Sequence, residues 1–173
     1  LVCVRNEEAR LAACLRRLSF CDEIVVVDGR CADRSEAIAR EMGAVVISGI
    51  WPLEGQRRAA GAAACSGDWI LEIDADEEVG EQLALEIRAR LLHAPPGDFV
   101  SVPVDNFIGD RLVRHGWGGS FGTSAVTRLF KRGVKTWGNE RVHPTVRFTG
   151  TAGASLTHPL QHRVDDNISD MWA

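Results

Sequence analysis

Residues 69–79 read WILEIDADEEV, an apolar run that leads directly into a dense group of carboxylates. The acidic residues are Glu72, Asp74, Asp76, Glu77 and Glu78. Like charges held this close disfavour ionisation unless a cation lies between them or their partners. Because Asp74 and Asp76 are two positions apart, their side chains point the same way in an extended backbone. The stretch therefore predicts a buried strand that ends at a cation site, and carboxylate oxygens suit Mg²⁺ or Mn²⁺.

Similar apolar runs recur along the first 104 residues and alternate with helical patterns. The expected strands cover residues 1–4, 23–28, 44–48, 69–74 and 99–104. Leucine spacing, an alanine-rich run and capping signals predict helices over about 7–19, 33–43, 54–65 and around 83–91. Such alternation forms right-handed βαβ units on a parallel sheet, so the fold class is α/β. Ligands of open α/β sheets bind beyond the carboxyl ends of the strands, where Asp28 and Asp74 are expected.

After residue 105 the pattern changes, and the short segments VTRLFK (126–131) and TVRFTG (145–150) are typical of antiparallel strands. We expect one domain in two halves, a nucleotide-binding half over residues 1–104 and an acceptor-type half over residues 105–173. The sequence begins LVCVRNEE, without Met and inside an expected strand. We therefore expect it to be a fragment of a longer protein.

The net charge of −4 hides a strong asymmetry along the chain. Residues 1–106 hold 11 basic and 19 acidic side chains, whereas residues 107–150 hold eight basic and two acidic ones. The basic segment is either an ordinary solvated face or a surface that attracts an anionic partner or membrane. No apolar run approaches the roughly 20 residues that cross a bilayer. Five cysteines without metal-site or disulfide spacing predict reduced, mostly buried thiols in a cytosolic protein.

Rival assignments of the acidic strand end fit the sequence less well. A calcium loop of the EF-hand type needs glycine where Val79 stands. A haloacid dehalogenase phosphatase carries its D-x-D motif on the first strand, and a dinucleotide-binding fold needs a glycine-rich loop where VRNEEARL stands. A solvated turn that caps the next helix accounts for Glu77, Glu78 and Glu81, since carboxylates favour helix N-termini.

The order of motifs carries more information than D-x-D alone. VRNEE (4–8), a strand ending in Asp28, GQRRAAG (55–61) and DADE (74–77) follow one another in the first half. NFIGDRLVRHGWGG (106–119), TRLFKRG (127–133), VHP (142–144) and LTHP (156–159) follow in the second. This order resembles the inverting family 2 glycosyltransferases of the GT-A fold, in particular the lipopolysaccharide core enzymes that add glucose or heptose. The resemblance implies a mainly parallel central sheet flanked by helices, with a smaller mixed region on the acceptor side.

The resemblance also implies roles for individual residues. Asp28 would contact the base or ribose of a nucleotide, Arg57 would lie near the nucleotide, and Asp74 would approach the ribose. Asp76 would bind Mg²⁺ or Mn²⁺ bridging the diphosphate of a nucleotide-diphosphate sugar. The loop GRCAD (29–33) keeps Asp33 but lacks the family's small polar residues, which leaves base and sugar selectivity open.

An inverting reaction needs a base that takes the proton of the acceptor hydroxyl. The resembling enzymes have VHE where this chain has Val142-His143-Pro144, so the usual glutamate is missing. Glu140 is the nearest acid and His143 a second candidate, since its ordinary pKa suits proton transfer near neutrality. An exposed ion pair is the alternative interpretation of Glu140.

Three further residues have two interpretations each. His158 would approach the metal or diphosphate, or be an ordinary core histidine. Trp117 would stack on a sugar, or anchor a glycine-rich loop. Arg128, with Arg132, would hold an acceptor phosphate or carboxylate, or be a solvated charge at a strand edge.

We therefore expect a metal-dependent inverting glycosyltransferase that is cytoplasmic or peripheral on the inner membrane. It would use a nucleotide-diphosphate sugar and a hydroxyl of an anionic, lipid-linked saccharide, with no nucleic-acid partner. One rival is a sugar-nucleotide pyrophosphorylase, which normally begins with a glycine-rich phosphate loop. The other is a non-catalytic sugar-nucleotide-binding module of the same fold, which Pro144 keeps open.

Overall fold

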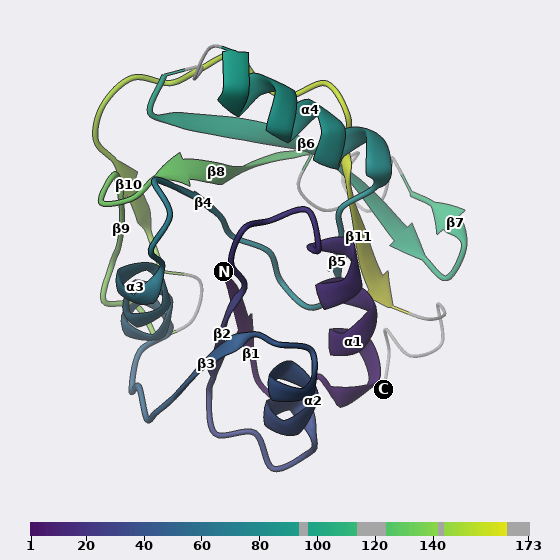
Figure 1. Ribbon diagram of the computed structural model, residues 1–173, viewed down its shortest axis with the longest axis vertical. Coiled ribbons are helices and arrows are strands. Elements are labelled where there is room, and N and C mark those ends of the chain that lie inside the picture. Colours follow the sequence, from purple (N-terminus) through teal and green to yellow (C-terminus); the bar gives the residue numbers. More distant parts are fainter. Residues whose placement is uncertain (94–96, 114–123, 142–143, 166–173) are drawn as a thin grey trace.

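The computed structural model describes residues 1–93, 97–113, 124–141 and 144–165 (Figure 1). Its first part is a parallel three-stranded sheet in the order β1-β2-β3. The strands are β1 (Val2–Val4), β2 (Val25–Asp28) and β3 (Val45–Ser48). Valines 25–27 are almost completely buried, as expected for a central parallel strand that is covered on both faces.

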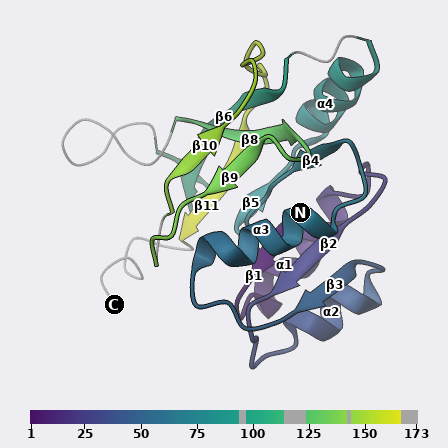
Figure 2. The same ribbon diagram turned by 90° about the vertical axis from the view of Figure 1, so that its left-hand side faces the viewer.

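Helices cover both faces of this sheet. α1 (Glu8–Arg17) and α2 (Ser35–Glu41) lie on one face, and α3 (Glu54–Ala64) lies on the other (Figure 2). Side chains alternate along β1, so Val2 packs with α1 while Cys3 faces the α3 side. Gly61 lets α3 approach closely, because a Cβ there would lie 2.5 Å from side-chain atoms of Leu1 and Val27.

The segment that contains the acidic cluster joins two sheets. β4 (Trp69–Leu71) pairs antiparallel with β8 (Ala125–Lys131), while Ile73 forms a parallel bridge with Val2 of β1. The carboxylates after β4 therefore lie between the parallel strands of the first half and strands of the second half.

The second sheet has the order β4-β8-β6-β11-β5, with β7 on the edge of β6. Its other strands are β5 (Glu77–Glu78), β6 (Phe99–Ile108), β7 (Arg111–Leu112) and β11 (Leu160–Asp165). β6 is antiparallel to β8 and parallel to β11. β9 (Lys135–Trp137) and β10 (Val146–Phe148) form a separate antiparallel pair beside α3. α4 (Glu81–His93) completes the elements and lies along β6 (Figure 1).

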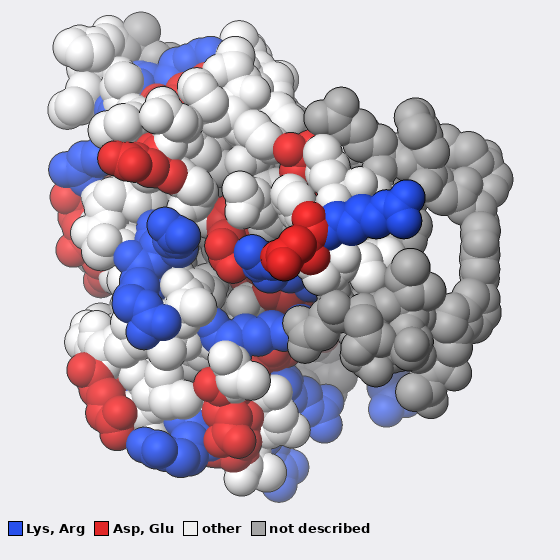
Figure 3. All heavy atoms as spheres, turned by 90° about the vertical axis from the view of Figure 1, so that its right-hand side faces the viewer, with Lys and Arg blue, Asp and Glu red and all other residues white. Residues whose placement is uncertain are grey.

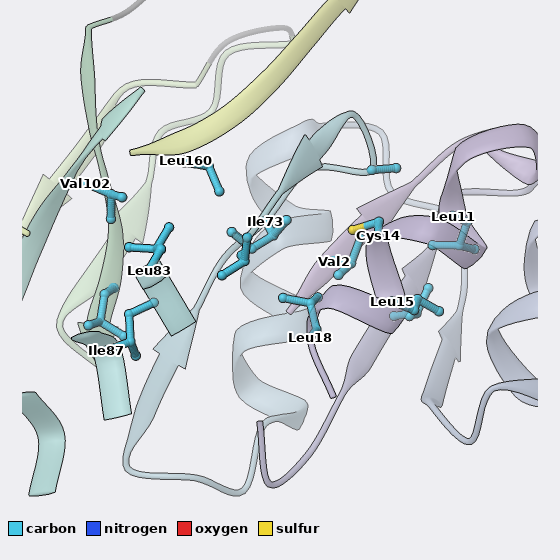
Figure 4. Packing of buried hydrophobic residues seen from close by; sticks show 14 of the residues in the cluster. Val2, Leu11, Cys14, Leu15, Leu18, Ile73, Leu83, Ile87, Val102 and Leu160 are labelled. Carbon is cyan, nitrogen blue, oxygen red and sulfur yellow. The ribbon is translucent and has the colours of Figure 1, made fainter. Parts of the chain in front are cut away.

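The largest hydrophobic cluster links the two sheets (Figure 4). Leu15 of α1, Leu83 of α4, Val102 of β6 and Leu160 of β11 belong to it, together with Ile73. Each of these five side chains is at most 3% exposed, so the helices and strands of both halves share one core. This shared core fixes the acidic segment relative to the strands of the second half.

The α/β fold class is confirmed, and every strand and helix expected from the sequence is present within a few residues. Two details differ. The strand expected at 99–104 extends to Ile108 and is antiparallel to its neighbour β8, so it does not continue the parallel sheet. The helix expected from residue 33 begins at Ser35, and Glu36 pairs with Arg40 instead of closing a capping box.

Two further expectations concern helices and thiols. No helix among the described residues is long and apolar enough to cross a membrane. All five cysteines are free, and Cys3, Cys14 and Cys65 are buried. Burial raises the pKa of Cys3 and Cys14 to about 12, which makes these thiols unreactive at neutral pH.

Candidate active site

The loops that follow β1 and β2 hold each other through polar contacts. The carboxylate of Asp28 accepts the N–H of Cys31 at 2.7 Å, and the side-chain oxygen of Asn6 accepts the N–H of Ala32 at 2.8 Å. Asp33 accepts the N–H of Glu8 at 3.0 Å, and further bonds run from the second loop back to the first. The motifs VRNEE and GRCAD therefore form two hydrogen-bonded loops, and Asp33 is one of the residues that join them.

A pocket of about 750 Å³ opens at the carboxyl ends of the parallel strands. Gly29, which directly follows Asp28, and Arg57 of α3 line it. The remaining lining residues are Arg5, Arg30, Gly49, Ile50, Trp51, Pro52, Leu53, Glu54 and Arg141. Four arginines and one glutamate make this pocket strongly positive, and its volume suits a nucleotide-sized ligand.

Arg57 is the least exposed of these four arginines, and a hydrogen bond holds its side chain in place. Its Nη1 lies 3.4 Å from the carbonyl oxygen of Val4, and its Nε is buried without a hydrogen-bond partner in the described chain. A Cβ at Gly29 would lie 2.6 Å from that Nη1, so the glycine makes room for the guanidinium. A buried donor that lacks an acceptor is costly unless a ligand supplies one. Arg57 is therefore placed to bind an anionic or carbonyl oxygen from outside the protein.

The carboxylates after β4 are neutralised mainly by the protein itself. Asp74 contacts Arg58 at 3.1 Å through one oxygen and Arg128 at 2.6 Å through the other. Arg128 also pairs with Glu77, and Arg58 also pairs with Glu72. These guanidinium groups therefore each bridge two acids of the cluster.

A lysine from β9 completes this network. Lys135 pairs with Glu72, which is 1% exposed. Burial opposes ionisation of Glu72, yet Lys135 and Arg58 hold its pKa below the ordinary value. Burial also opposes ionisation of Asp74, but Arg128 and Arg58 outweigh it and lower the pKa of this carboxyl group. The pKa of Glu77 is raised, because its burial outweighs the attraction of Arg128.

Two interpretations of the sequence change as a result. Glu77 is buried and paired with Arg128, so its assignment to a solvated helix cap was wrong, although Glu81 does lie exposed in the first turn of α4. The basic segment 107–150 is only partly an external surface. Arg128, Lys135 and Lys131 pair with acids of the first half, which explains much of the charge asymmetry along the chain.

Asp76 differs from the other four carboxylates of the cluster. Its ion pair is with a histidine, since the Nε2 of His162 lies 3.4 Å from its Oδ2. The Nδ1 of His162 lies 2.9 Å from the side-chain oxygen of Asn106, which orients the ring. The hydrogen bond with Asp76 raises the pKa of His162 despite its partial burial. The pKa of Glu7 is also raised, first by burial and then by the charge of Asp76.

His162 was missed in the sequence analysis. It comes beside Asp76 only through the pairing of β11 with β5, in which His162 stands opposite Glu77. The predicted metal residue His158 has a different partner, since its Nδ1 lies 2.9 Å from the carboxylate of Glu86 in α4. No local pattern distinguishes these two histidines, because the choice depends on the register of β11.

The candidate base Glu140 lies in the second half of the chain. The carboxylate of Glu140 accepts hydrogen bonds from the hydroxyl and the N–H of Thr145, at 2.7 and 3.1 Å, in the loop between β9 and β10. These bonds, the hydroxyl first, lower the pKa of Glu140. No ion pair joins it to Arg141 within the described residues. His143 and Trp117 lie outside the described residues, so their predicted roles stay predictions.

The arrangement of Asp76 and His162 fits a divalent metal ion. Two adjacent ligands of an octahedral ion, each about 2.1 Å from it, lie about 3 Å apart, close to the observed 3.4 Å. Asn106 fixes the second ring nitrogen, as outer partners do for metal-bound histidines. No group of three or more potential ligand residues occurs in the described part of the chain. The site therefore suits an ion that takes its remaining ligands from phosphate and water.

These features together define a GT-A glycosyltransferase fold. They are a parallel α/β sheet, an acidic strand end, a positive pocket beyond the parallel strands and a mixed second sheet. The chain matches the family described as Glycosyl transferase family 2 over residues 1–149, and it belongs to that family. The resemblance found in the order of motifs is confirmed.

Individual relatives agree with this placement. LpsC of Rhizobium meliloti, named a lipopolysaccharide core biosynthesis glycosyltransferase, is 28% identical over 94% of this chain and 61% of LpsC. An uncharacterized glycosyltransferase of Rickettsia felis is 38% identical over 50% of this chain and 31% of that protein. These matches thus cover between about one third and three fifths of the length of the two relatives.

Among solved structures, S. aureus TarS (residues 1–349) superposes with a TM-score of 0.67 at 13% identity. The superposition covers 94% of this chain and 59% of that one. The same TarS fragment has also been solved in complex with UDP. At this level of identity the likeness shows the shared fold.

Proposed function

We propose that this chain is the catalytic part of a metal-dependent inverting glycosyltransferase. It transfers a sugar from a nucleotide-diphosphate sugar to a hydroxyl of an anionic, lipid-linked saccharide of the lipopolysaccharide core type. The observation that carries the proposal is the different partner of Asp76. The other four carboxylates of the cluster each pair with an arginine or a lysine, whereas Asp76 faces His162.

Asp76 and His162 are the residues that would hold Mg²⁺ or Mn²⁺. When bound, such an ion stabilises the negative charge that develops on a departing nucleoside diphosphate. His158 is not part of this proposal, because its imidazole is committed to Glu86. The role first predicted for His158 therefore passes to His162.

The donor nucleotide is assigned to the pocket beyond the parallel strands. Asp28 directly precedes the lining residue Gly29, and one of its oxygens is held by the N–H of Cys31. We assign the other oxygen to a base or ribose group of the nucleotide. Arg57 lines the pocket and offers its guanidinium group to the nucleotide. Asp74 approaches the ribose, and Arg58 and Arg128 keep it ionised and oriented. Arg128 thus acts on the donor through Asp74, and an acceptor anion would have to reach a side chain that is only 12% exposed.

On the acceptor side, Glu140 is the described candidate for the base. Its lowered pKa keeps it ionised, as a base must be, but weakens its affinity for the proton. Accepting a proton from the sugar hydroxyl requires the carboxylate to exchange its bond with Thr145 for one with the acceptor. His143 remains the second candidate, and Trp117 the proposed sugar-stacking residue. The name of LpsC, a lipopolysaccharide core biosynthesis glycosyltransferase, supports a lipid-linked acceptor. We infer that such an enzyme works at the cytoplasmic face of the inner membrane.

The test compares Asp76→Asn and His162→Ala with His158→Gln. Isothermal titration of UDP, GDP and ADP sugars with and without Mn²⁺ should show that the first two variants lose the metal-dependent part of donor affinity. His158→Gln should keep it, and the reverse result would refute the assignment. Product analysis then separates the rivals. Nucleoside diphosphate release indicates transfer, pyrophosphate release indicates a pyrophosphorylase, and donor binding without turnover indicates a binding module.

A further inference from the structure

We propose that the rim of the donor pocket is a docking surface for an anionic lipid bilayer. The rim consists of Arg5, Arg30, Ile50 and Arg141, which all line the same pocket. It combines unpaired guanidinium groups with an exposed apolar side chain. Such a combination binds the interface of membranes that contain anionic lipids.

The charges of the rim are not balanced within the described chain. Arg5, Arg30 and Arg141 are exposed, and none has an ion-pair or side-chain hydrogen-bond partner among the described residues. The one acid that lines the pocket, Glu54, is already paired with Arg58 at 2.8 Å. Three like charges without a counter-charge are expected to attract an anion from outside.

The proposed nucleotide does not account for all of this charge. A donor diphosphate carries about two negative charges, which one divalent ion at Asp76 would offset. The less exposed Arg57, which lines the same pocket, is available for any remaining phosphate or ribose oxygen. The three exposed arginines therefore exceed what the nucleotide needs.

An apolar side chain marks the same rim. Ile50 is 71% exposed at the tip of the loop that joins β3 to α3, and the next residues are Trp51 and the exposed Pro52. A single exposed isoleucine is ordinary for a soluble protein. Ile50 beside a half-buried tryptophan and three unpaired arginines is the pattern of an interfacial segment, in which the apolar tip enters the headgroup region.

One other surface among the described residues also places an exposed leucine beside arginines. On the face that carries α1 and β11, Lys and Arg side chains lie beside Asp and Glu side chains (Figure 3). The exposed Leu85 of α4 is that leucine and lies beside Arg88, which is engaged by the carbonyl oxygen of Phe20 and by Asp22. Two exposed arginines of α1 line the same shallow pocket, Arg16 and Arg17. The rim differs from this surface in having three arginines and a tryptophan next to its exposed apolar side chain.

Docking through the rim has a consequence for the acceptor. Arg141 belongs to the loop between β9 and β10, which also carries Glu140. A bilayer that contacts Arg141 would hold a lipid-linked saccharide near the acceptor side. Docking itself needs neither donor nor acceptor, so its failure would leave the proposed glycosyl transfer standing.

The test is sedimentation with vesicles of phosphatidylcholine alone and vesicles in which part of it is replaced by phosphatidylglycerol. We expect the protein to bind the anionic vesicles at least about tenfold more tightly, and added salt to weaken this binding. The double variant Arg30→Glu/Arg141→Glu should lose about tenfold or more in affinity. Ile50→Asp should lose several-fold. Arg132→Glu and Leu92→Asp, which change an exposed arginine and an exposed leucine elsewhere, should bind as the unchanged protein does.

Three outcomes would overturn the proposal. The first is that the protein binds neutral and anionic vesicles with equal affinity, and the second is that the control variants lose as much affinity as the rim variants. The third is that Mn²⁺ with UDP releases vesicle-bound protein, which would assign the arginines to the nucleotide. Thermal unfolding checks that each variant is folded. If a charge reversal prevents folding, Arg30→Gln/Arg141→Gln replaces it, and unchanged vesicle affinity in that variant equally refutes docking.

Discussion

Two groups of basic side chains lie at the carboxyl edge of the sheets, and they differ in whether the protein supplies their counter-charges. In the buried group, Arg58, Arg128 and Lys135 each contact at least one carboxylate of the acidic strand end. In the pocket, Arg5, Arg30, Arg57 and Arg141 have no acidic partner among the described residues. The first group stabilises the protein and positions Asp74, whereas the second is prepared for ligands.

The adjacent residues Arg57 and Arg58 make this difference concrete. Both lie on α3, and successive helical positions point in different directions. Arg58 faces the acids Glu54, Glu72 and Asp74, while Arg57 faces the carbonyl oxygen of Val4 and the pocket. The two arginines of the motif GQRRAAG therefore have different roles, although they are adjacent in the sequence.

The largest effect is expected from removing a buried cation. Arg128→Met leaves Asp74 and Glu77 close together without the guanidinium that bridges them, and we expect a loss of about 3–5 kcal/mol in the free energy of unfolding. Urea unfolding measures this loss. Arg141→Met, in the pocket, should change stability by less than about 0.5 kcal/mol.

The double variant Arg128→Met/Glu77→Gln provides a second check. Because Asp74 keeps its ion pair with Arg58, Glu77 is the carboxylate that the single variant leaves without a cation among the described residues. Removing its charge should therefore restore part of the lost stability. If the single Arg128→Met variant is as stable as Arg141→Met, the distinction between the two groups of arginines fails.

The next effect concerns Asp76. Asp76→Asn keeps the shape of the side chain but removes its charge, and we expect transfer activity to fall at least about a hundredfold. Stability should change little, since the ion pair of Asp76 is with the partly exposed His162 and not with a buried arginine or lysine. Initial rates over a range of Mn²⁺ concentrations measure the effect. Full activity at low Mn²⁺ would exclude this carboxylate from a metal site.

The sequence allowed the fold of residues 1–104 to be predicted well because its signals are local. Three valines ending in Asp28, and an apolar run ending in Asp74, indicate buried strands whose carboxyl ends meet at one edge. The α3 motif that contains Arg57 has the same local character. These residues do lie at the carboxyl edge of the sheets, as the pattern of strands requires.

The ionic partners of the site were not predictable in the same way. Arg128 and His162 reach the acidic cluster only through the antiparallel pairing of β8 with β4 and of β11 with β5. Lys135 reaches it from β9, which lies beside α3. Strand register over such separations leaves no local pattern in the sequence. The excess of basic residues in 107–150 was a signal of this complementarity, but it also fitted an external ligand surface.

A smaller effect distinguishes Arg57 from Arg58 in donor binding. Arg57→Ala should weaken binding of the nucleotide donor about tenfold, the range of one hydrogen bond to a charged group. Stability should stay nearly constant, because the variant removes a buried Nε that has no acceptor. Arg58→Ala should instead lower stability, as Arg128→Met does. Calorimetric titration and urea unfolding on both variants test the pair, and a large stability loss in Arg57→Ala would contradict the comparison.

The smallest effect tests an acid whose negative charge is satisfied by N–H groups. Glu86 accepts the N–H groups of Thr157 and His158 and contacts the imidazole of His158. Although its partial burial opposes ionisation, these bonds lower the pKa of Glu86 to about 2 from 4.5. Because the folded-state pKa is depressed, the stabilisation is complete above the unfolded value and is lost as the pH falls toward the folded one.

We therefore expect Glu86→Gln to be about 1 kcal/mol less stable than the unchanged protein at pH 7. The difference should narrow below about pH 4.5 and approach zero near pH 2. Urea unfolding at several pH values measures it, and Glu81→Gln is a control at an exposed acid of the same helix. Because Glu86 binds His158, a loss of metal-dependent donor binding in Glu86→Gln would return His158 to the metal site and weaken the case for His162.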